Sequence, residues 1–221
     1  MIALKGGSGK TTIATHMALA AHLRDVATLV VDLDPQHSAK GVLSARESAG
    51  PDYVASSGSA LMAAKFAALG LGKQLLVIDT AAGAVEDVSE ALVLADLALL
   101  VARPTLLDLA GLAPTLSIVR RLGKPAVVVV NQAPVARGSV EAPLVKRALR
   151  GLEYLQATVA PVIVRSRTMY QTALETGRSA EEMSDAAAAR EIAALWDFVE
   201  AELMAVVEEP APPDDLRAEG G

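Results

Sequence analysis

The sequence predicts an α/β protein in which helices cover both faces of a mostly parallel β-sheet. Of its 221 residues 52% are apolar, chiefly Ala, Val and Leu. The Val, Leu and Ile residues occur in short runs, such as 126–130, and these runs alternate with Ala-rich stretches of helical composition. Short continuous apolar runs are typical of strands that are buried on both faces, as they are in a parallel sheet. The length suits one domain with a substantial core.

Each predicted strand is an apolar run, and each predicted helix lies between two of these runs. We expect strands at 1–4, 27–33, 74–78, 97–102, 126–130 and 159–164, and a short one at 53–55 within a loop-rich region, 44–60. We expect helices at 11–23, 61–69, 85–94, 109–122, 140–149, 169–175 and 186–207. The last is amphipathic, with Trp196 and Leu203 on its apolar side, and Ser179 with Glu182 forms a capping box before it.

The domain is expected to span residues 1–207, followed by an acidic, Pro-rich tail over 208–221 that we predict to be disordered. The chain has no cysteine. This excludes disulfides, thiolate metal sites and iron–sulfur clusters, and it favours the reducing cytoplasm. The charge-free run 125–136 is too short for a membrane helix, which needs about 20 apolar residues. A strand that starts at the first residues leaves no room for a signal peptide.

A glycine-rich loop between the first strand and the first helix is the strongest functional signal. Three glycines let successive backbone N–H groups point into one concavity that binds phosphate oxygens. The helix that starts near Lys10 adds the positive end of its dipole. Lys10 can reach the terminal phosphates, and the Thr11 hydroxyl can ligate Mg²⁺. The predicted nucleotide-binding residues are Gly6, Gly7, Ser8, Gly9, Lys10, Thr11 and Thr12.

Aspartates follow two of the predicted strands. Alternation puts Asp32 and Asp34 on the same side of one strand end, and Asp79 closes the run 75–78. At the carboxyl ends of parallel strands these carboxylates would lie near the phosphate loop. The metal site is therefore expected to comprise Thr11, Asp32, Asp34 and Asp79. The plain alternatives are an Asx-Pro turn after Asp34 and a strand that merely ends in Asp.

The run Lys5-Gly6-Gly7-Ser8-Gly9-Lys10-Thr11-Thr12 resembles the deviant phosphate loop of the ParA/MinD family of ATPases. The resemblance implies a P-loop NTPase three-layer sandwich that binds ATP and Mg²⁺. It also implies an ATP-sandwich dimer in which Lys5 reaches the partner's phosphates. The implied catalytic residues are Lys5, Lys10 and Asp34, with Asp34 positioning the attacking water. The run 1–4 is two or three residues shorter than the family's first strand, which predicts weaker support for the loop and lower nucleotide affinity.

Two later segments, 103–108 and 167–177, look like those of the small ParF-like partition ATPases. The resemblance implies a weak ATPase that a ParB/ParG-like activator or cargo adaptor stimulates, and a dimer that binds the nucleoid without sequence preference. Residues 120–178 carry 10 basic and 3 acidic side chains, although the whole chain has a net charge of −6. The DNA-binding candidates are Arg120, Arg121, Arg165, Arg167 and Arg178, with Lys146, Arg147 and Arg150. The plain alternative is a solvated helical face.

Several readings remain open. The same cycle could partition plasmid or chromosomal DNA, or position other cargo such as chemoreceptor clusters or microcompartments. Two alternatives belong to other functional classes: an ATP-dependent metabolic enzyme on this scaffold, and a nucleotide-gated binding module. Asn131 and Pro161 stand where contacts to the adenine could occur, with ordinary strand-end residues as the alternative. The acidic C-terminus argues against membrane anchoring, since a membrane-binding helix would carry basic residues.

Overall fold

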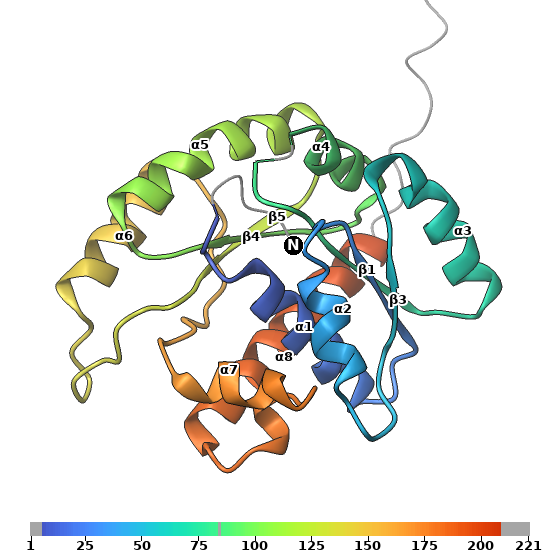
Figure 1. The fold of residues 1–221 in the computed structure, drawn as a ribbon. Coiled ribbons are helices and arrows are strands. Elements are labelled where there is room, and N and C mark those ends of the chain that lie inside the picture. Colours follow the sequence, from blue (N-terminus) through green and yellow to red (C-terminus); the bar gives the residue numbers. More distant parts are fainter. Residues whose placement is uncertain (1–5, 84, 209–221) are drawn as a thin grey trace, which may run out of the picture.

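The computed structural model describes residues 6–83 and 85–208, and it confirms the α/β fold class (Figure 1). Its elements alternate along the chain: α1 Lys10–His22, β1 Thr28–Asp32, α2 Ser38–Ser44, β2 Asp52–Ala55, η1 Gly58–Ala60, α3 Leu61–Gly70, β3 Leu75–Asp79, α4 Val85–Leu94, β4 Ala98–Ala102, α5 Leu106–Arg121, β5 Ala126–Val130, α6 Pro143–Tyr154, α7 Thr168–Glu175, η2 Ala180–Glu182 and α8 Ala186–Glu208. The predicted strand at 1–4 and nearly all of the predicted tail lie outside the described residues.

Every strand pair in the described part of the chain is parallel. β1 lies between β2 and β3, with Asp32 opposite Asp79 at their carboxyl ends, and β4 pairs with β5. The predicted strand at 159–164 is reduced to a bridge between Val128 and Val159 and a later backbone bond from Val164 N to Val130 O at 3.0 Å. Pro161 falls between these two points, and proline cannot donate to a strand ladder.

Alternating side chains divide the core between two helical layers (Figure 1). On β4, Leu99 and Val101 pack against α1 and α8, while Leu100 faces α4, α5 and α6. On β1, Val30 faces α1 and α2, while Val31 faces α3 and α4. Helix α1 contacts residues of β1, β3, β4 and β5, so it holds the two groups of paired strands together. Among the described residues, no helix is both long enough and apolar enough to cross a membrane.

Capping explains where the helix boundaries differ from those predicted. Helix α5 starts three residues earlier than expected because the Thr105 hydroxyl accepts the N–H of Asp108 at 3.2 Å. Helix α6 starts at Pro143, later than expected, because proline suits the first helical turn. Helix α2 was not predicted, and the distant Asp32 carboxylate accepts the N–H of Lys40 in it. The capping box of Ser179 and Glu182 is confirmed, at the start of η2.

Candidate functional site

The described part of the glycine loop, residues 6–9, leads directly into α1. Gly9 has φ 87°, a left-handed conformation that side chains other than glycine disfavour, and a Cβ atom there would collide with the Asn131 amide. Gly6 and Gly7 are exposed, whereas Ser8 and Lys10 are buried. The loop therefore presents its first backbone groups to solvent at the amino end of a helix, which suits an anion. The predicted Lys5 lies outside the described residues.

The side-chain amides of two residues that follow β5 donate hydrogen bonds to backbone carbonyls of this loop. Asn131 donates from Nδ2 to the carbonyl of Ser8 at 2.8 Å, and Gln132 donates from Nε2 to the carbonyl of Gly7 at 3.3 Å. The buried side chain of Asn131 thus supports the loop, and its predicted contact with the adenine stays a prediction. Gln132 is not among the site residues predicted from the sequence. The only sequence signal for its role is its position shortly after the end of β5. The predicted Pro161 is exposed.

Lys10 is the first residue of α1 and lies among carboxylates. Burial lowers the pKa of Lys10, and the nearby Asp79 and Asp34 carboxylates oppose that shift. Its ammonium group thus lies near two of the predicted site aspartates. A buried cation at the amino end of a helix can balance the charge of bound phosphates.

Asp79 is fully buried, and within the described residues neither of its carboxylate oxygens has a hydrogen-bond partner. The Thr11 hydroxyl lies near it without reaching hydrogen-bond geometry. Burial raises the pKa of Asp79 to about 6, against the opposing effects of Thr11 and Lys10. A buried carboxylate without a partner is costly, so its presence indicates a ligand that the described residues do not supply. Carboxylate and hydroxyl oxygens are the ligands that Mg²⁺ prefers.

Asp32 and Asp34 differ in their surroundings. Asp32 is fully buried and accepts the backbone N–H groups of Asp34 at 3.0 Å and Lys40 at 3.1 Å, so it orders the loop between β1 and α2. Asp34 is half-buried, and its Oδ1 accepts the N–H of Gln36 at 2.9 Å. Asp32 thus acts first as a support for the loop that carries Asp34, which leaves Asp34 the better placed of the two to act on a ligand.

The donor set fits Mg²⁺ bound together with a nucleotide rather than Mg²⁺ held by protein alone. In the described ranges, no group of three or more His, Asp or Glu side chains lies close enough to hold a metal ion. Mg²⁺ in nucleotide sites is bound by one or two protein ligands and completed by phosphates and water. Asp79 and Thr11 are the two residues that would hold it here.

The segment 103–108, singled out from the sequence, forms the first turn of α5 after β4. Arg103 pairs with Asp108 through Nε–Oδ2 at 2.5 Å and Nη2–Oδ1 at 3.2 Å. Asp108 is buried, while Leu106 and Leu107 are exposed. The ion pair therefore holds the turn rigid while two leucines face solvent at the carboxyl end of β4.

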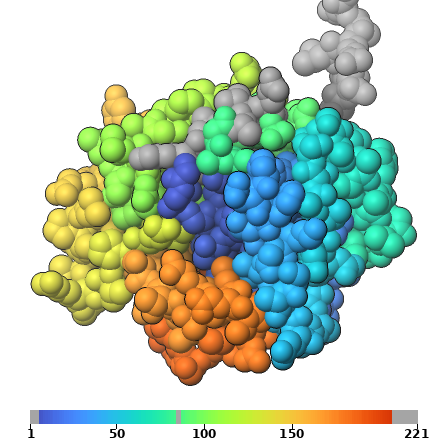
Figure 2. All heavy atoms as spheres, in the orientation of Figure 1, coloured from blue at the N-terminus to red at the C-terminus, as the bar shows by residue number. Residues whose placement is uncertain are grey.

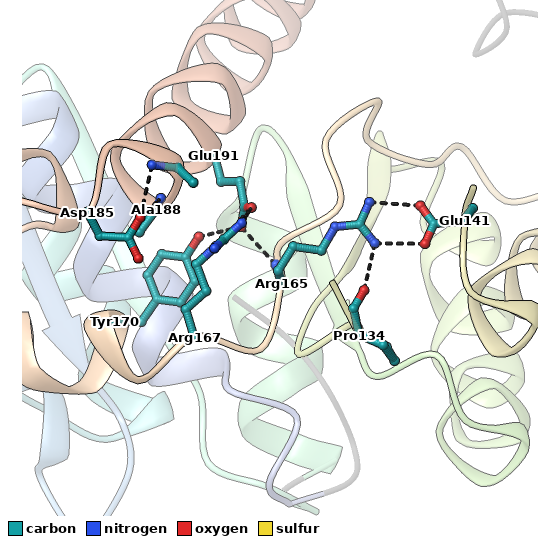
Figure 3. A network of polar contacts seen from close by, with 9 residues as sticks. Pro134, Glu141, Arg165, Arg167, Tyr170, Asp185, Ala188 and Glu191 are labelled. Atoms are coloured by element: carbon teal, nitrogen blue, oxygen red, sulfur yellow. Dashed lines mark hydrogen bonds and ion pairs between the residues drawn. The ribbon is translucent and has the colours of Figure 1, made fainter. Parts of the chain in front are cut away.

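Two of the predicted DNA-binding arginines are engaged in ion pairs within the protein (Figure 3). Arg165 pairs with Glu141 at 2.7 Å, and its Nη1 also donates to the carbonyl of Pro134. Arg167 pairs with Glu191 at 2.7 Å. These arginine side chains are only 15% and 20% exposed. Their carboxylate partners come from the loop before α6 and from α8, so the two arginines join these parts of the fold.

Glu191 is the centre of this network. Its carboxylate accepts from the Arg167 guanidinium, from the Arg165 backbone N–H at 2.8 Å and from the Tyr170 hydroxyl at 2.5 Å (Figure 3). The Tyr170 ring packs edge-on against His16 of α1, with centroids 5.4 Å apart. His16 is buried, and burial lowers its pKa to about 4. The network thus connects the phosphate-loop helix to α7 and α8.

The remaining basic candidates are more accessible. Arg120 donates to the carbonyls of Leu155 and Gln156 beyond α6, although its side chain is exposed. Arg121 and Arg178 are exposed. Helix α6 has three exposed cations on its outer side, and within the described ranges none of them forms an ion pair: Lys146, Arg147 and Arg150.

A cavity of about 390 Å³ lies at the other end of the strands from the phosphate loop. Its lining is mainly apolar and comes from α3, β3, β4 and α8, including Trp196. None of the predicted nucleotide, metal or DNA residues contributes to it. The cavity is therefore separate from the site described above.

The site and the fold agree with a known family and with solved structures. A family model described as the CobQ/CobB/MinD/ParA nucleotide-binding domain matches residues 1–185. No curated protein sequence matches. Apo McdA from Cyanothece superposes with a TM-score of 0.73 at 17% identity, covering 91% of this chain and 96% of that one. The cell division ATPase MinD of Pyrococcus furiosus superposes with a TM-score of 0.73 at 16% identity, covering 90% of this chain and 96% of that one. A ParA family ATPase from Chlorobium tepidum superposes with a TM-score of 0.63 at 15% identity, covering 90% of this chain and 96% of that one.

Proposed function

Because this chain belongs to the CobQ/CobB/MinD/ParA family of nucleotide-binding proteins, we propose that it is an ATP-driven switch that partitions DNA. In this cycle ATP and Mg²⁺ close a dimer, the dimer binds the nucleoid without sequence preference, and slow hydrolysis releases it. A ParB/ParG-like activator or a cargo adaptor stimulates that hydrolysis. The protein would then be cytoplasmic and associated with the nucleoid.

The buried carboxylate of Asp79 beside the phosphate loop, which has no hydrogen-bond partner among the described residues, carries this proposal. It lies near Lys10 and Thr11, and Lys10 in turn is close to Asp34. One patch of the molecule therefore combines an anion-binding loop, a buried cation and an oxygen ligand that lacks a partner. This combination is what a magnesium nucleotide requires. ATP supplies the phosphates and Mg²⁺ neutralises their charge, while the protein positions them.

Hydrolysis would depend on Asp34, the more accessible of the two aspartates after β1. Its carboxylate lies near Lys10 and is half-exposed, so it can meet a water molecule that attacks the terminal phosphate. We expect Asp34→Ala to retain ATP binding and lose hydrolysis, and Lys10→Ala to lose both. Fluorescent-nucleotide titration and phosphate release measure the two activities. Unchanged hydrolysis in Asp34→Ala would refute the assigned role.

The dimer proposal rests on the resemblance at Lys5, which would reach the phosphates bound by a second copy. A lysine supplied in this way stabilises developing charge as an arginine finger does. Asp34→Ala with ATP should sediment as a dimer, whereas Lys5→Ala should remain monomeric in ATP. ADP should leave both proteins monomeric, because the terminal phosphate is absent. A monomer under every nucleotide condition would contradict the proposal.

Nucleoid binding is best supported on α6, where cations are exposed and unpaired among the described residues. DNA binding should appear with ATP or a non-hydrolysable analogue, and it should weaken as salt rises. Replacing Arg147 and Arg150 by alanine should lower the slope of log K against log salt by about 2 for each subunit that contacts DNA, since each phosphate contact contributes about 0.9. Arg190→Ala, an exposed cation on α8, is the matched control. DNA binding in no nucleotide state, with ATP still bound, would favour a metabolic enzyme on this scaffold instead.

A further inference from the structure

Two carboxamides contact the phosphate loop at consecutive peptide units. The carbonyl of Gly7 accepts from Gln132 Nε2 at 3.3 Å, and the carbonyl of Ser8 accepts from Asn131 Nδ2 at 2.8 Å. In the space-filling view, the dark blue start of α1 lies near the centre of the face, beside the yellow-green segment that follows β5 (Figure 2). The amides therefore bind two acceptors of the loop and leave its N–H groups free for another ligand.

The position of each carbonyl also fixes the direction of an N–H group. In a planar trans peptide, the C=O of one residue and the N–H of the next point in opposite directions. The carbonyl of Gly7 shares its peptide with the N–H of Ser8, and the carbonyl of Ser8 shares its peptide with the N–H of Gly9. Both N–H groups therefore point away from the two amides, and within the described residues neither donates a hydrogen bond. They continue the row of free N–H groups in the first turn of α1, where Ile13 donates the first helical bond to Gly9.

Gln132 is held in a backbone conformation that its side chain disfavours. Its φ is 53°, in the left-handed region that residues other than glycine rarely occupy. Backbone bonds of both neighbours impose this turn. The N–H of Asn131 donates to the carbonyl of Ala102 at 2.8 Å, and the N–H of Ala133 donates at 3.1 Å to the carbonyl of Val164. The fold therefore maintains a strained turn that brings both amides against the loop, and strain of this kind is typical of functional sites.

We propose that Asn131 and Gln132 are positioning residues that hold the loop in its phosphate-binding conformation before the nucleotide arrives. Three glycines give this loop wide conformational freedom, so a free loop would have to be ordered on binding, which lowers affinity. The two amides remove that cost by fixing the loop in advance. The inference rests on the proposed binding of ATP and concerns its phosphates rather than its base. Loss of either amide should therefore weaken every ligand that carries the phosphate chain by the same factor.

Competition of ATP and of inorganic tripolyphosphate against a fluorescent ATP analogue, all with Mg²⁺, tests this role. Tripolyphosphate has the phosphate chain without base or ribose. Gln132→Ala should weaken both ligands by about fivefold, as the loss of one hydrogen bond does. Asn131→Ala removes a buried and shorter bond and should weaken both by more than about tenfold. An Asn131→Ala protein that loses affinity for ATP but not for tripolyphosphate would overturn this role for Asn131 and assign its amide to the base.

Gln132→Gly separates positioning from stability. Glycine accepts a positive φ, so this variant should unfold at a higher temperature than Gln132→Ala, yet it should bind ATP and tripolyphosphate no better. Gln156→Gly is the matched control, since Gln156 has a φ of 51° and lies just beyond the carboxyl end of α6. This control should tolerate glycine equally well and should keep the affinity of the wild type for both ligands.

The outcomes separate this role from the proposed function. Wild-type affinity for tripolyphosphate in both Gln132→Ala and Gln132→Gly would overturn the proposal, even if Asn131→Ala does not fold. Circular dichroism and thermal unfolding without nucleotide show whether each variant folds. A wild type that binds neither ATP nor tripolyphosphate would refute the proposed function itself, and with it any role of the two amides in binding.

Discussion

Replacing Asp79 by asparagine should stabilise the nucleotide-free protein while it removes Mg²⁺-dependent hydrolysis. Asp79 is fully buried, and in the described residues its carboxylate has no hydrogen-bond partner. Asparagine has almost the same shape and carries no charge, so it avoids the cost of burying an ion. The same change removes an anionic oxygen ligand that Mg²⁺ would use. Stability and activity are therefore expected to move in opposite directions.

The magnitude follows from the pKa of Asp79, which burial raises from 3.8 to about 6. Because the folded state binds this proton more tightly than the unfolded state does, the ionised group lowers the stability as pH rises from about 4 to about 6. Above pH 6 the loss is complete and amounts to at most about 3 kcal/mol. Asp79→Asn should thus be up to about 3 kcal/mol more stable than the wild type near neutral pH, and nearly equal to it near pH 4.

Denaturant unfolding without nucleotide or Mg²⁺, at neutral pH and near pH 4, measures this difference. The comparison must be between variant and wild type, because His16 changes the stability of both proteins in the opposite direction over the same range. Asp34→Asn is the matched control, since Asp34 is half-exposed and should lose activity with little change in stability. An Asp79→Asn protein that is less stable than the wild type near neutral pH would refute the reasoning, because Asp79 would then have favourable native contacts.

Three further predictions concern stability and binding. The pKa of His16 in the folded protein, about 4, lies below that of an exposed histidine. The free energy of unfolding should therefore fall as pH drops from about 6.5 to about 4. His16→Gln should remove this loss in acid unfolding experiments. Gly9→Ala should weaken nucleotide binding and destabilise the fold by more than about 1 kcal/mol, because its φ is positive and Asn131 occupies the space. Gly41→Ala, in open space on α2, should leave nucleotide binding unchanged and should not destabilise the fold, because alanine has the higher helix propensity. Glu191→Ala should cost about 3 kcal/mol in chemical unfolding, because it leaves Arg167 unpaired, and a cost below about 0.5 kcal/mol would show that the network adds no stability.

The features that could be predicted from the sequence are local ones. The order of strands and helices, the glycine loop at the start of α1 and the aspartates after β1 and β3 all appear as short patterns. Each pattern depends on residues that are close in the chain: apolar runs for buried strands, glycines for a left-handed loop, and carboxylates at strand ends. The family follows from the same local motifs, and the match over residues 1–185 confirms it.

The partners of individual side chains could not be predicted, because residues far apart in the chain provide them. Nothing near Arg165 and Arg167 in the sequence indicates that Glu141 and Glu191 neutralise them. In the same way, the sequence does not indicate that the amide of Asn131 donates to the carbonyl of Ser8, 123 residues earlier in the chain.

The sequence by itself therefore determined which chemistry the chain can perform, because phosphate binding requires glycines, a lysine and a hydroxyl in one short run. Only the tertiary structure decided which of its charged groups are available for that chemistry. It buried Asp79 with no partner among the described residues and paired Arg165 and Arg167 inside the protein, whereas it left the cations of α6 exposed. The physical reason is that burial and pairing set the energy of a charge, and both depend on contacts that only the folded chain makes.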